Sequence, residues 1–353
     1  MNEDQWEFLT ELLETPSPAG YETRGQRVWV DYVEQFADEV RTDAYGNAVA
    51  VYEGGDDGPA IAVTGHADEI GFNVRRIDDN GFLHLAAVGG VDRTVSRGQR
   101  VTVHTADGPV TGVVGQNAVH IRDGDDEAVD VTKQPVDVGA ADGEDTREVV
   151  EVGDPVTFAT TVESLMGTRI AGRGLDNRVG NWVAAETLRR AAEASVETSV
   201  YAISTVQEEL GTHGAKMVGD RLDLDAVVVV DVTHASDYPG SKPEKAGDVA
   251  LGDGPVVARG SANHPVVAQA VRKVASDSAI DVQLQADPRH TGTDANAFFV
   301  ASGGVPTLNL GIPNRYMHTP VEVVDTEDVD AAADLLAAFA GQASEYDSFA
   351  VDV

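Results

Sequence analysis

Apolar residues along this chain fall into two alternating patterns: short continuous runs, and stretches in which they recur every three or four positions. The continuous runs predict buried strands at 61–65, 200–206, 226–230 and 307–310. The periodic stretches predict helices at 23–37 and around four apolar sets: Phe8, Leu9, Leu12 and Leu13; Trp182, Ala185, Leu188 and Ala192; Val267, Ala270, Val271 and Val274; Val329, Ala332, Leu336 and Phe339. This alternation predicts an α/β fold, a sheet flanked by helices on both faces.

The stretch 72–162 follows a different pattern. It is rich in valine and glycine and has no helical period, and Asn80-Gly81 and Asp107-Gly108 are typical of hairpin turns. We therefore predict a small all-β domain at 72–162, inserted into an α/β domain made of 1–71 and 163–353. Two irregular segments are also predicted: an acidic loop at 137–148, and a turn at Gly311-Ile312-Pro313.

Composition narrows the classes of function. Sixty acidic residues against 25 lysines and arginines give a net charge of −35, a field that repels nucleic acid and anionic lipid. No apolar run approaches the roughly 18 to 20 residues of a membrane span, and the first residues lack the basic-then-apolar pattern of a signal peptide. Cysteine is absent, which excludes disulfides and thiolate ligands. We expect a cytoplasmic protein with no nucleic-acid or membrane partner.

Acid excess and lysine scarcity occur together along the whole chain. One reading is ordinary acidic solubility. The other is a halophilic protein, because molar salt shortens the Debye length to about 3 Å and removes most of the self-repulsion. The co-occurrence favours the second reading. The lysines of the chain are Lys133, Lys216, Lys242, Lys245 and Lys273.

Candidate metal ligands follow the predicted strands or precede a helix. In an open α/β sheet such positions meet at one rim, outside the carboxyl ends of the strands. Each alone has a commoner reading, since an aspartate before a helix is usually an N-cap and paired acids are usually solvated. Together they give two histidines and several carboxylates without sulfur, the ligand set of a two-metal hydrolytic site. These residues are His66, Asp176, Glu208, Glu209, Asp231 and His318.

Several segments resemble the tetrahedral (TET) aminopeptidases, a family of dinuclear metallopeptidases that also contains glutamyl and deblocking aminopeptidases. The similar segments span nearly the whole chain, in the family's order and spacing: 64–72, 174–178, 206–211, 230–235, 292–295 and 315–319. The resemblance implies a zinc-exopeptidase-like α/β fold with a mixed sheet, and an inserted β domain that carries dimer contacts. It also implies short peptide substrates and a homo-dodecamer with its active sites facing an inner cavity.

The resemblance also assigns roles to residues. Asp176 would bridge two divalent metal ions, held about 3.5 to 4 Å apart. His66 and Asp231 would complete one site, and Glu209 and His318 the other. Glu208 would be the general base, and Asp68 would orient His66 from behind. The residues alone leave the order of Glu208 and Glu209 open: on an extended segment neighbouring side chains point to opposite sides, so either could face the metals.

Zinc suits these nitrogen and oxygen ligands, and cobalt or manganese would fit the same set. Where the family often has Pro-Pro-His, this chain has Asn117-Ala118-Val119-His120, so His120 is kept out of the site. His213 could line a substrate pocket or be a loop histidine, and the second reading is favoured. His84 and His104 are expected on strand surfaces.

Three classes of function compete. The first is a dinuclear aminopeptidase that removes N-terminal residues by metal-activated water. The second is a metal-dependent carboxypeptidase or deacylase of the same fold, which would need an arginine for the substrate carboxylate; Arg289 and Arg315 are the candidates. The third is a non-catalytic binding relative, which loss of a ligand or the base would favour, and none is lost. Glycoside cleavage by two carboxylates is disfavoured by the histidines among the ligands.

Overall fold

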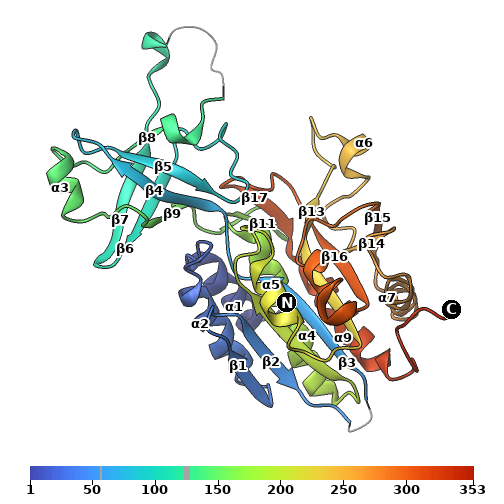
Figure 1. Ribbon diagram of the computed structural model, residues 1–353. Helices are drawn as coiled ribbons and strands as arrows, with labels where there is room; N and C mark the ends of the chain where they lie inside the picture. The colour runs from blue at the N-terminus through green and yellow to red at the C-terminus, as the bar shows by residue number, and fades with distance from the viewer. Residues whose placement is uncertain (56–57, 123–127) are drawn as a thin grey trace.

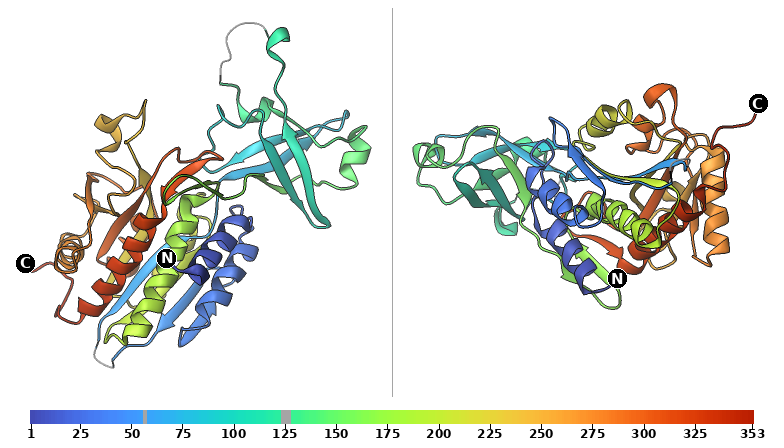
Figure 2. Two further views of the ribbon diagram at one scale, coloured as in Figure 1. Left: turned by 180° about the vertical axis from the view of Figure 1, so that it is seen from behind. Right: turned by 90° about the horizontal axis from the view of Figure 1, so that it is seen from below.

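The computed structural model describes residues 1–55, 58–122 and 128–353. Within these ranges the strands form an eight-stranded mixed sheet, a closed six-stranded barrel and a three-stranded sheet (Figure 1). The barrel lies to one side of the large sheet and its helices, and the three-stranded sheet lies between the two (Figures 1 and 2). The predicted α/β fold class, with a large mixed sheet and a separate small β structure, is confirmed.

The large sheet has parallel strands at its centre and antiparallel pairs toward its edges. Strand β3 pairs in parallel with β12 and β13, and β13 pairs in parallel with β16, so the carboxyl ends of these four strands share one edge. In order across the sheet, the strands are β1 (Glu39–Thr42), β2 (Ala48–Tyr52), β12 (Ser199–Thr205), β3 (Ala60–His66), β13 (Ala226–His234), β16 (Thr307–Asn314), β14 (Val256–Arg259) and β15 (Gln283–Ala286).

The predicted turn at Gly311-Ile312-Pro313 is wrong, because these residues continue strand β16. The backbone carbonyl of Asn314 accepts a hydrogen bond from Ala235 N at 2.9 Å, on the β13 side of the strand. Backbone groups alternate between the two sides of a strand, so Pro313 faces the β14 side. There only Leu310 and Gly311 pair with β14. The missing N–H of Pro313 therefore costs no ladder hydrogen bond.

Helices cover both faces of the large sheet, as predicted. On one face Ile61 and Val63 pack with the helices that carry the predicted apolar sets. On the other face Ala62 packs under two short helices, so successive side chains of β3 point to opposite faces and both faces are buried. The first group is α1 (Glu3–Glu14), α2 (Thr23–Val33), α4 (Leu175–Ala194), α7 (Pro265–Asp277) and α9 (Thr326–Ala343); the second is α5 (His213–Gly219) and α8 (Ala295–Phe298), with the 3-10 turn η3 (Ala301–Gly303) beside them.

The barrel closes in the order β4-β5-β8-β7-β6-β9 around its own apolar core. The second predicted hairpin turn is one residue out of place, since Gly108 already pairs with Thr105 and the loop is Ala106-Asp107. The segment predicted as an acidic loop contains a short helix, α3 (Gly143–Arg147), because Asp142 caps its N-terminus. The barrel strands are β4 (Gly71–Ile77), β5 (Leu83–Val88), β6 (Arg100–Thr105), β7 (Gly108–Val114), β8 (Pro135–Asp137) and β9 (Pro155–Phe158).

Two connections join the barrel to the large sheet, and an ion-pair cluster ties them together. The first runs from His66 at the end of β3 to β4. The second leads from β9 through β10 (Glu163–Ser164) and β11 (Arg169–Gly172) to α4, with β17 (Glu322–Asp325) pairing to β11. Buried Glu69 on the first connection forms ion pairs with Arg173 on the second and with Arg178 of α4, and Arg178 Nη2 lies 2.9 Å from Glu69 Oε1.

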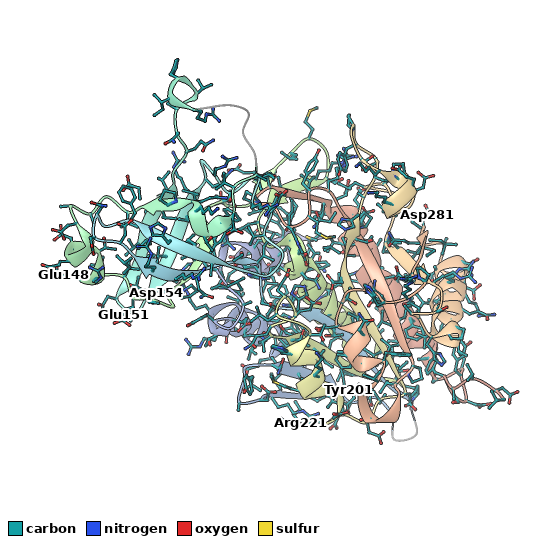
Figure 3. All side chains as sticks on the ribbon, turned by 45° about the horizontal axis from the view of Figure 1, so that its top comes forward. Glu148, Glu151, Asp154, Tyr201, Arg221 and Asp281 are labelled. Atoms are coloured by element: carbon teal, nitrogen blue, oxygen red, sulfur yellow. The ribbon has the colours of Figure 1, made fainter. Side chains whose placement is uncertain are left out.

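Acidic side chains are found at both ends of the molecule. Glu148, Glu151 and Asp154 lie on the barrel, and Asp281 lies beyond α7 at the far end of the large sheet (Figure 3). The remaining short helices are the 3-10 turns η1 (Val119–Ile121) and η2 (Val131–Lys133), and α6 (Pro243–Ala246). No helix among the described residues is both long and apolar enough to span a membrane.

Candidate metal centre

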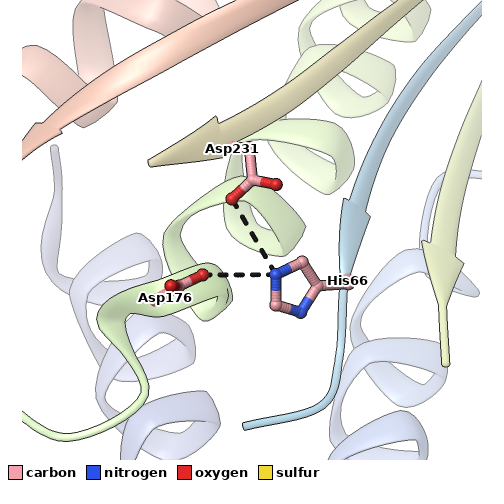
Figure 4. A group of neighbouring side chains, drawn as sticks. All are labelled: His66, Asp176 and Asp231. Carbon is pink, nitrogen blue, oxygen red and sulfur yellow. Dashed lines mark ion pairs between the residues drawn. The ribbon is translucent and has the colours of Figure 1, made fainter. Parts of the chain in front are cut away.

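His66 stands at the carboxyl end of β3, next to two aspartates that come from other elements. Its Nε2 lies 3.2 Å from Asp176 Oδ1 and 3.8 Å from Asp231 Oδ1 (Figure 4). All three side chains are buried. Asp231 lies inside β13 rather than just after it, because that strand continues to His234 beside β16. The structure therefore brings these three predicted residues together.

The other nitrogen of His66 faces its own loop. Nδ1 lies 3.1 Å from the backbone oxygen of Asp68 and 3.4 Å from Asp68 Oδ1. A carbonyl oxygen can only accept, so Nδ1 carries a proton, and Nε2 is the nitrogen that faces Asp176 and Asp231. When protonated, Nε2 donates to these carboxylates; when deprotonated, it offers its lone pair to a cation. The expected support of His66 by Asp68 thus comes from the backbone carbonyl at least as much as from the carboxylate.

His318 contacts the other carboxylate oxygen of Asp176. Its Nε2 lies 3.3 Å from Asp176 Oδ2 and 3.6 Å from Glu209 Oε1. Its Nδ1 lies 3.0 Å from the backbone oxygen of Gly90, on the barrel loop after β5, so Nε2 is again the nitrogen that faces the carboxylates. The barrel therefore contributes directly to the geometry of this histidine.

Asp176 is the centre of the group, since each of its carboxylate oxygens meets a different histidine. It lies at the start of α4, where Asp176 and Asn177 have non-helical backbone angles. Asn177 Nδ2 donates a hydrogen bond to the backbone oxygen of Val230 at 2.8 Å, which links the start of α4 to strand β13. This contact holds Asp176 beside Asp231.

Glu208 and Glu209 lie in a turn after β12, not on the extended segment that was expected. The backbone oxygen of Glu208 accepts hydrogen bonds from the N–H groups of Gly211 and Thr212, which closes the turn. The argument that the two side chains point to opposite sides is therefore wrong, and both carboxylates reach the group around His66. They differ in their other neighbours: only Glu209 also lies within reach of Asp176 and His318.

The carboxylate of Asp68 holds this turn. Its Oδ1 accepts a hydrogen bond from Glu208 N at 2.9 Å, and its Oδ2 accepts one from Glu209 N at 3.1 Å. Asp68 is fully buried, so these bonds are not weakened by competing water. One residue thus positions both His66 and the paired glutamates.

The electrostatics of the group are those of acids crowded in a buried space. Burial raises the pKa of Glu208 to about 10 and the pKa of Glu209 to about 7, and it raises the pKa of Asp231 well above its usual range. Burial acts in the same direction on Asp176, but hydrogen bonds from His318 and His66 lower its pKa below the usual range. Burial alone would lower the pKa of His66, yet hydrogen bonds to Asp176 and Asp68 raise it.

The donors fit a pair of divalent cations. Three sets of ligand atoms lie within 4.8 Å of one another: His66, Asp176 and Asp231; His66, Glu208 and Glu209; and Asp176, Glu209 and His318. The first and third sets share Asp176, and each combines one imidazole nitrogen with carboxylate oxygens, which suits zinc and similar ions. Cations between these groups would also favour the ionised carboxylates that burial opposes.

Sequence reasoning missed one acid beside the centre. Glu322, at the start of β17, is buried, and its carboxylate accepts hydrogen bonds from Asp176 N and from His318 N, both at 3.0 Å. The available signal was a single acid within the apolar run 321–324. A second acid, Asp294, lies in a segment that entered only through the family resemblance. It is buried, accepts a hydrogen bond from Thr205 Oγ1 at 2.6 Å, and has a pKa raised by burial to about 6.

The remaining candidates are not drawn into the group. His120 is exposed on η1, and His213 is exposed at the first residue of α5 rather than in a loop. His84 and His104 lie on strands of the barrel, as expected, and both are half-buried. Arg315 Nε and Nη2 both contact the carboxylate of Asp237, at 2.8 and 2.5 Å. Arg289 is exposed.

Comparison with known proteins identifies the family. The family model described as M42 glutamyl aminopeptidase matches residues 46–335, which include all the candidate metal ligands and the barrel. The chain belongs to the M42 glutamyl aminopeptidase family. As an M42 aminopeptidase it is a hydrolase that acts on peptide bonds, and the resemblance inferred from its motifs is confirmed.

Similar proteins agree over nearly the whole chain. A lysyl aminopeptidase of Pyrococcus furiosus is 35% identical over 332 residues, covering 92% of this chain and 93% of its own. A TET aminopeptidase from the marine sediment archaeon Thaumarchaeota archaeon SCGC AB-539-E09 superposes with a TM-score of 0.91, at 31% identity and 96% coverage of both chains. The TET1 peptidase of Pyrococcus horikoshii, which can assemble into a tetrahedron or a large octahedral shell, gives 0.85 at 29% identity, covering 95% of this chain and 99% of its own.

Proposed function

We propose that this M42 family member is a dinuclear metal-dependent aminopeptidase that removes N-terminal residues from short peptides. The observation that carries the proposal is the placement of Asp176. Its two carboxylate oxygens lie 3.2 and 3.3 Å from the Nε2 atoms of two different histidines, His66 and His318. A carboxylate whose two oxygens face different histidines can bind two adjacent cations, one through each oxygen. A site for a single cation would not need this arrangement.

In this proposal each cation takes a separate set of ligands and shares Asp176. His66 and Asp231 would complete one site, and Glu209 and His318 the other. Bound divalent ions would polarise the scissile carbonyl and lower the pKa of a bound water toward about 7. Zinc is the ion we propose, with cobalt or manganese suited to the same donors.

Glu208 is the residue we propose as general base. It lies with His66 and Glu209 but is absent from the set around His318, so it can face the reacting water while Glu209 binds an ion. Its carboxylate would take the proton of that water and deliver it to the leaving amine. Burial raises the pKa of Glu208 to about 10, and nearby cations would lower it toward the range that a base needs. Asp68 would position the turn that carries it.

The carboxypeptidase and deacylase alternatives have less support. Both need a free cationic group for a substrate carboxylate. Arg315, one of the two candidates, already contacts Asp237 through Nε and Nη2. A non-catalytic role has less support too, because the proposed ligands and the proposed base all converge.

We extend the proposal to assembly and setting. Relatives named TET peptidases form a dodecamer or a tetrahedron, and we propose a homo-dodecamer here, with the segment 72–162 as a dimerisation domain. Such an assembly would admit short peptides to an inner cavity. We also propose a halophilic enzyme of the cytoplasm, on the basis of the net charge of −35.

A paired assay tests the proposed function. Aminoacyl chromogenic substrates, and a peptide with a blocked C-terminus, are offered to enzyme whose metal content is measured in the same preparation. We expect release of the N-terminal residue and two ions per subunit. Activity only on a peptide with a free C-terminus would support the carboxypeptidase alternative instead. One ion per subunit at full activity would contradict the dinuclear site.

A further inference from the structure

The carboxylate of Glu322 connects the two halves of the candidate metal centre. It does so by accepting hydrogen bonds from backbone N–H groups rather than by contacting the ligand side chains. Its Oε2 accepts a hydrogen bond from Asp176 N and its Oε1 accepts one from His318 N, each at 3.0 Å. The carboxylate therefore spans the segment that carries the shared aspartate and the segment that carries a terminal ligand. It is buried, so both bonds are protected from water.

The segment that carries His318 has a backbone shape that needs support. His318 has a φ of 64° and Tyr316 has a φ of 62°. These angles lie in the left-handed region, which residues other than glycine rarely adopt. Such conformations persist only where the surroundings fix them. The hydrogen bonds of Glu322 are made at Asp176 and His318 themselves.

We propose that Glu322 is a positioning residue that sets the separation of Asp176 and His318 and thereby the affinity of the ion held by Asp176, Glu209 and His318. The inference rests on the proposed dinuclear function and deepens it. Glu322 is not itself a ligand in this proposal, because both of its oxygens are engaged with backbone N–H groups. Strand β17 makes it rigid, since Glu322 pairs with Gly172 of β11.

Glutamine at residue 322 would keep the shape and break the contact. An amide has one oxygen that accepts and an NH2 group that only donates. One of the two backbone N–H groups would therefore face another donor. Removing a supporting partner of a metal ligand typically lowers metal affinity by about 10 to 100-fold. We expect a loss in that range for one ion, because His318 lies on a loop and can shift more than the start of α4.

Asp328 offers a matched control away from the centre. It is also buried, and its carboxylate accepts hydrogen bonds from Gly252 N and Gly254 N, each at 2.8 Å. Asp328→Asn therefore removes the same kind of contact from a loop that holds no proposed ligand. Its expected effect is a lower melting temperature with unchanged metal affinity.

The experiment is a zinc titration of metal-depleted full-length protein by calorimetry, with ions per subunit counted after dialysis. Wild type and Asp328→Asn should bind two ions with equal affinities, and Glu322→Gln should bind one normally and one about 10 to 100-fold more weakly. If Glu322→Gln does not fold, Glu322→Asp decides by the same measure, because its shorter side chain cannot reach both N–H groups. Equal affinities in the Glu322 variant and in Asp328→Asn would overturn the proposal. Wild type that binds fewer than two ions would instead overturn the dinuclear function, and this inference with it.

Discussion

Replacing Gly90 by alanine gives the most direct test of the contact between the barrel and the metal centre. A methyl group at this position would lie 2.4 Å from His318 Nδ1 and 2.6 Å from His318 Cε1. Because nonbonded heavy atoms pack at about 3.5 Å or more, the imidazole or the loop must move by about 1 Å. Either movement also disturbs the hydrogen bond between His318 Nδ1 and the backbone oxygen of Gly90.

The size of that movement sets the expected loss. A misplacement of about 1 Å in a catalytic group can lower turnover about 100-fold. We therefore expect kcat/KM of Gly90→Ala on an aminoacyl chromogenic substrate to fall by about that factor. The metal content should fall from two ions per subunit toward one, because His318 is a proposed ligand of only one ion. Both quantities are measured on the same preparation.

Gly115→Ala is the control for this experiment. Gly115 also belongs to the barrel, but an added methyl group would lie 3.4 Å from its nearest neighbour, Pro135 O, which is an ordinary contact. That variant should keep full activity and both ions. Retention of both ions and of normal kcat/KM in Gly90→Ala would show that the barrel loop does not support His318.

Three further predictions follow from the site and the charge. Glu208→Gln should lower turnover by roughly 100-fold with both ions retained, which is the effect of losing a general base. Glu209→Gln should instead weaken the binding of one ion. Equal metal loss in the two variants would contradict the assigned roles. Chelation of the metal ions should abolish activity and lower the melting temperature, since an ion present at 100 times its Kd stabilises a fold by about 2.7 kcal/mol. A metal-free protein of equal stability would contradict the proposal of two buried metal ions. Dilution from molar to about 0.1 M salt lengthens the Debye length from about 3 to about 10 Å. Sedimentation should therefore show dissociation of the oligomer at a higher salt concentration than the one at which circular dichroism shows unfolding. An oligomer that stays intact and active would mean that the acidic surface serves only solubility.

The sequence predicted that several candidate residues would come together, because these residues lie at or near the ends of buried strands. His66 and the paired glutamates come at or just after apolar runs, and the parallel register of β3, β12 and β13 brings their ends to one edge. That relation needs only local patterns and a general rule about open sheets. The fold class could be predicted for the same reason, since strand runs and helical periods are local signals.

The remaining features depend on contacts between distant segments. Glu322 lies among valines, and nothing in that run shows that two N–H groups from 146 and 4 residues away converge on it. The turn at Glu208 is closed by its own backbone and held by Asp68, 140 residues earlier. Pro313 in a strand contradicts local propensity, and it is allowed because the neighbouring strand β14 stops pairing before that residue.

The two connections between the sheet and the barrel have a consequence for protomer shape. The first contains Asp68 and Glu69 directly after His66, and the second leads into Asp176 past Arg173, which pairs with Glu69. A hinge that moved the barrel would have to bend these connections, and each of them leads to a residue of the candidate metal centre, His66 or Asp176. If the proposed ions bind, the angle between barrel and sheet should therefore be coupled to metal loading. An assembly built through the barrel, as proposed for this chain, would then take its curvature from the metal-loaded centre. Removing the proposed ions should loosen the angle between barrel and sheet before the chain unfolds.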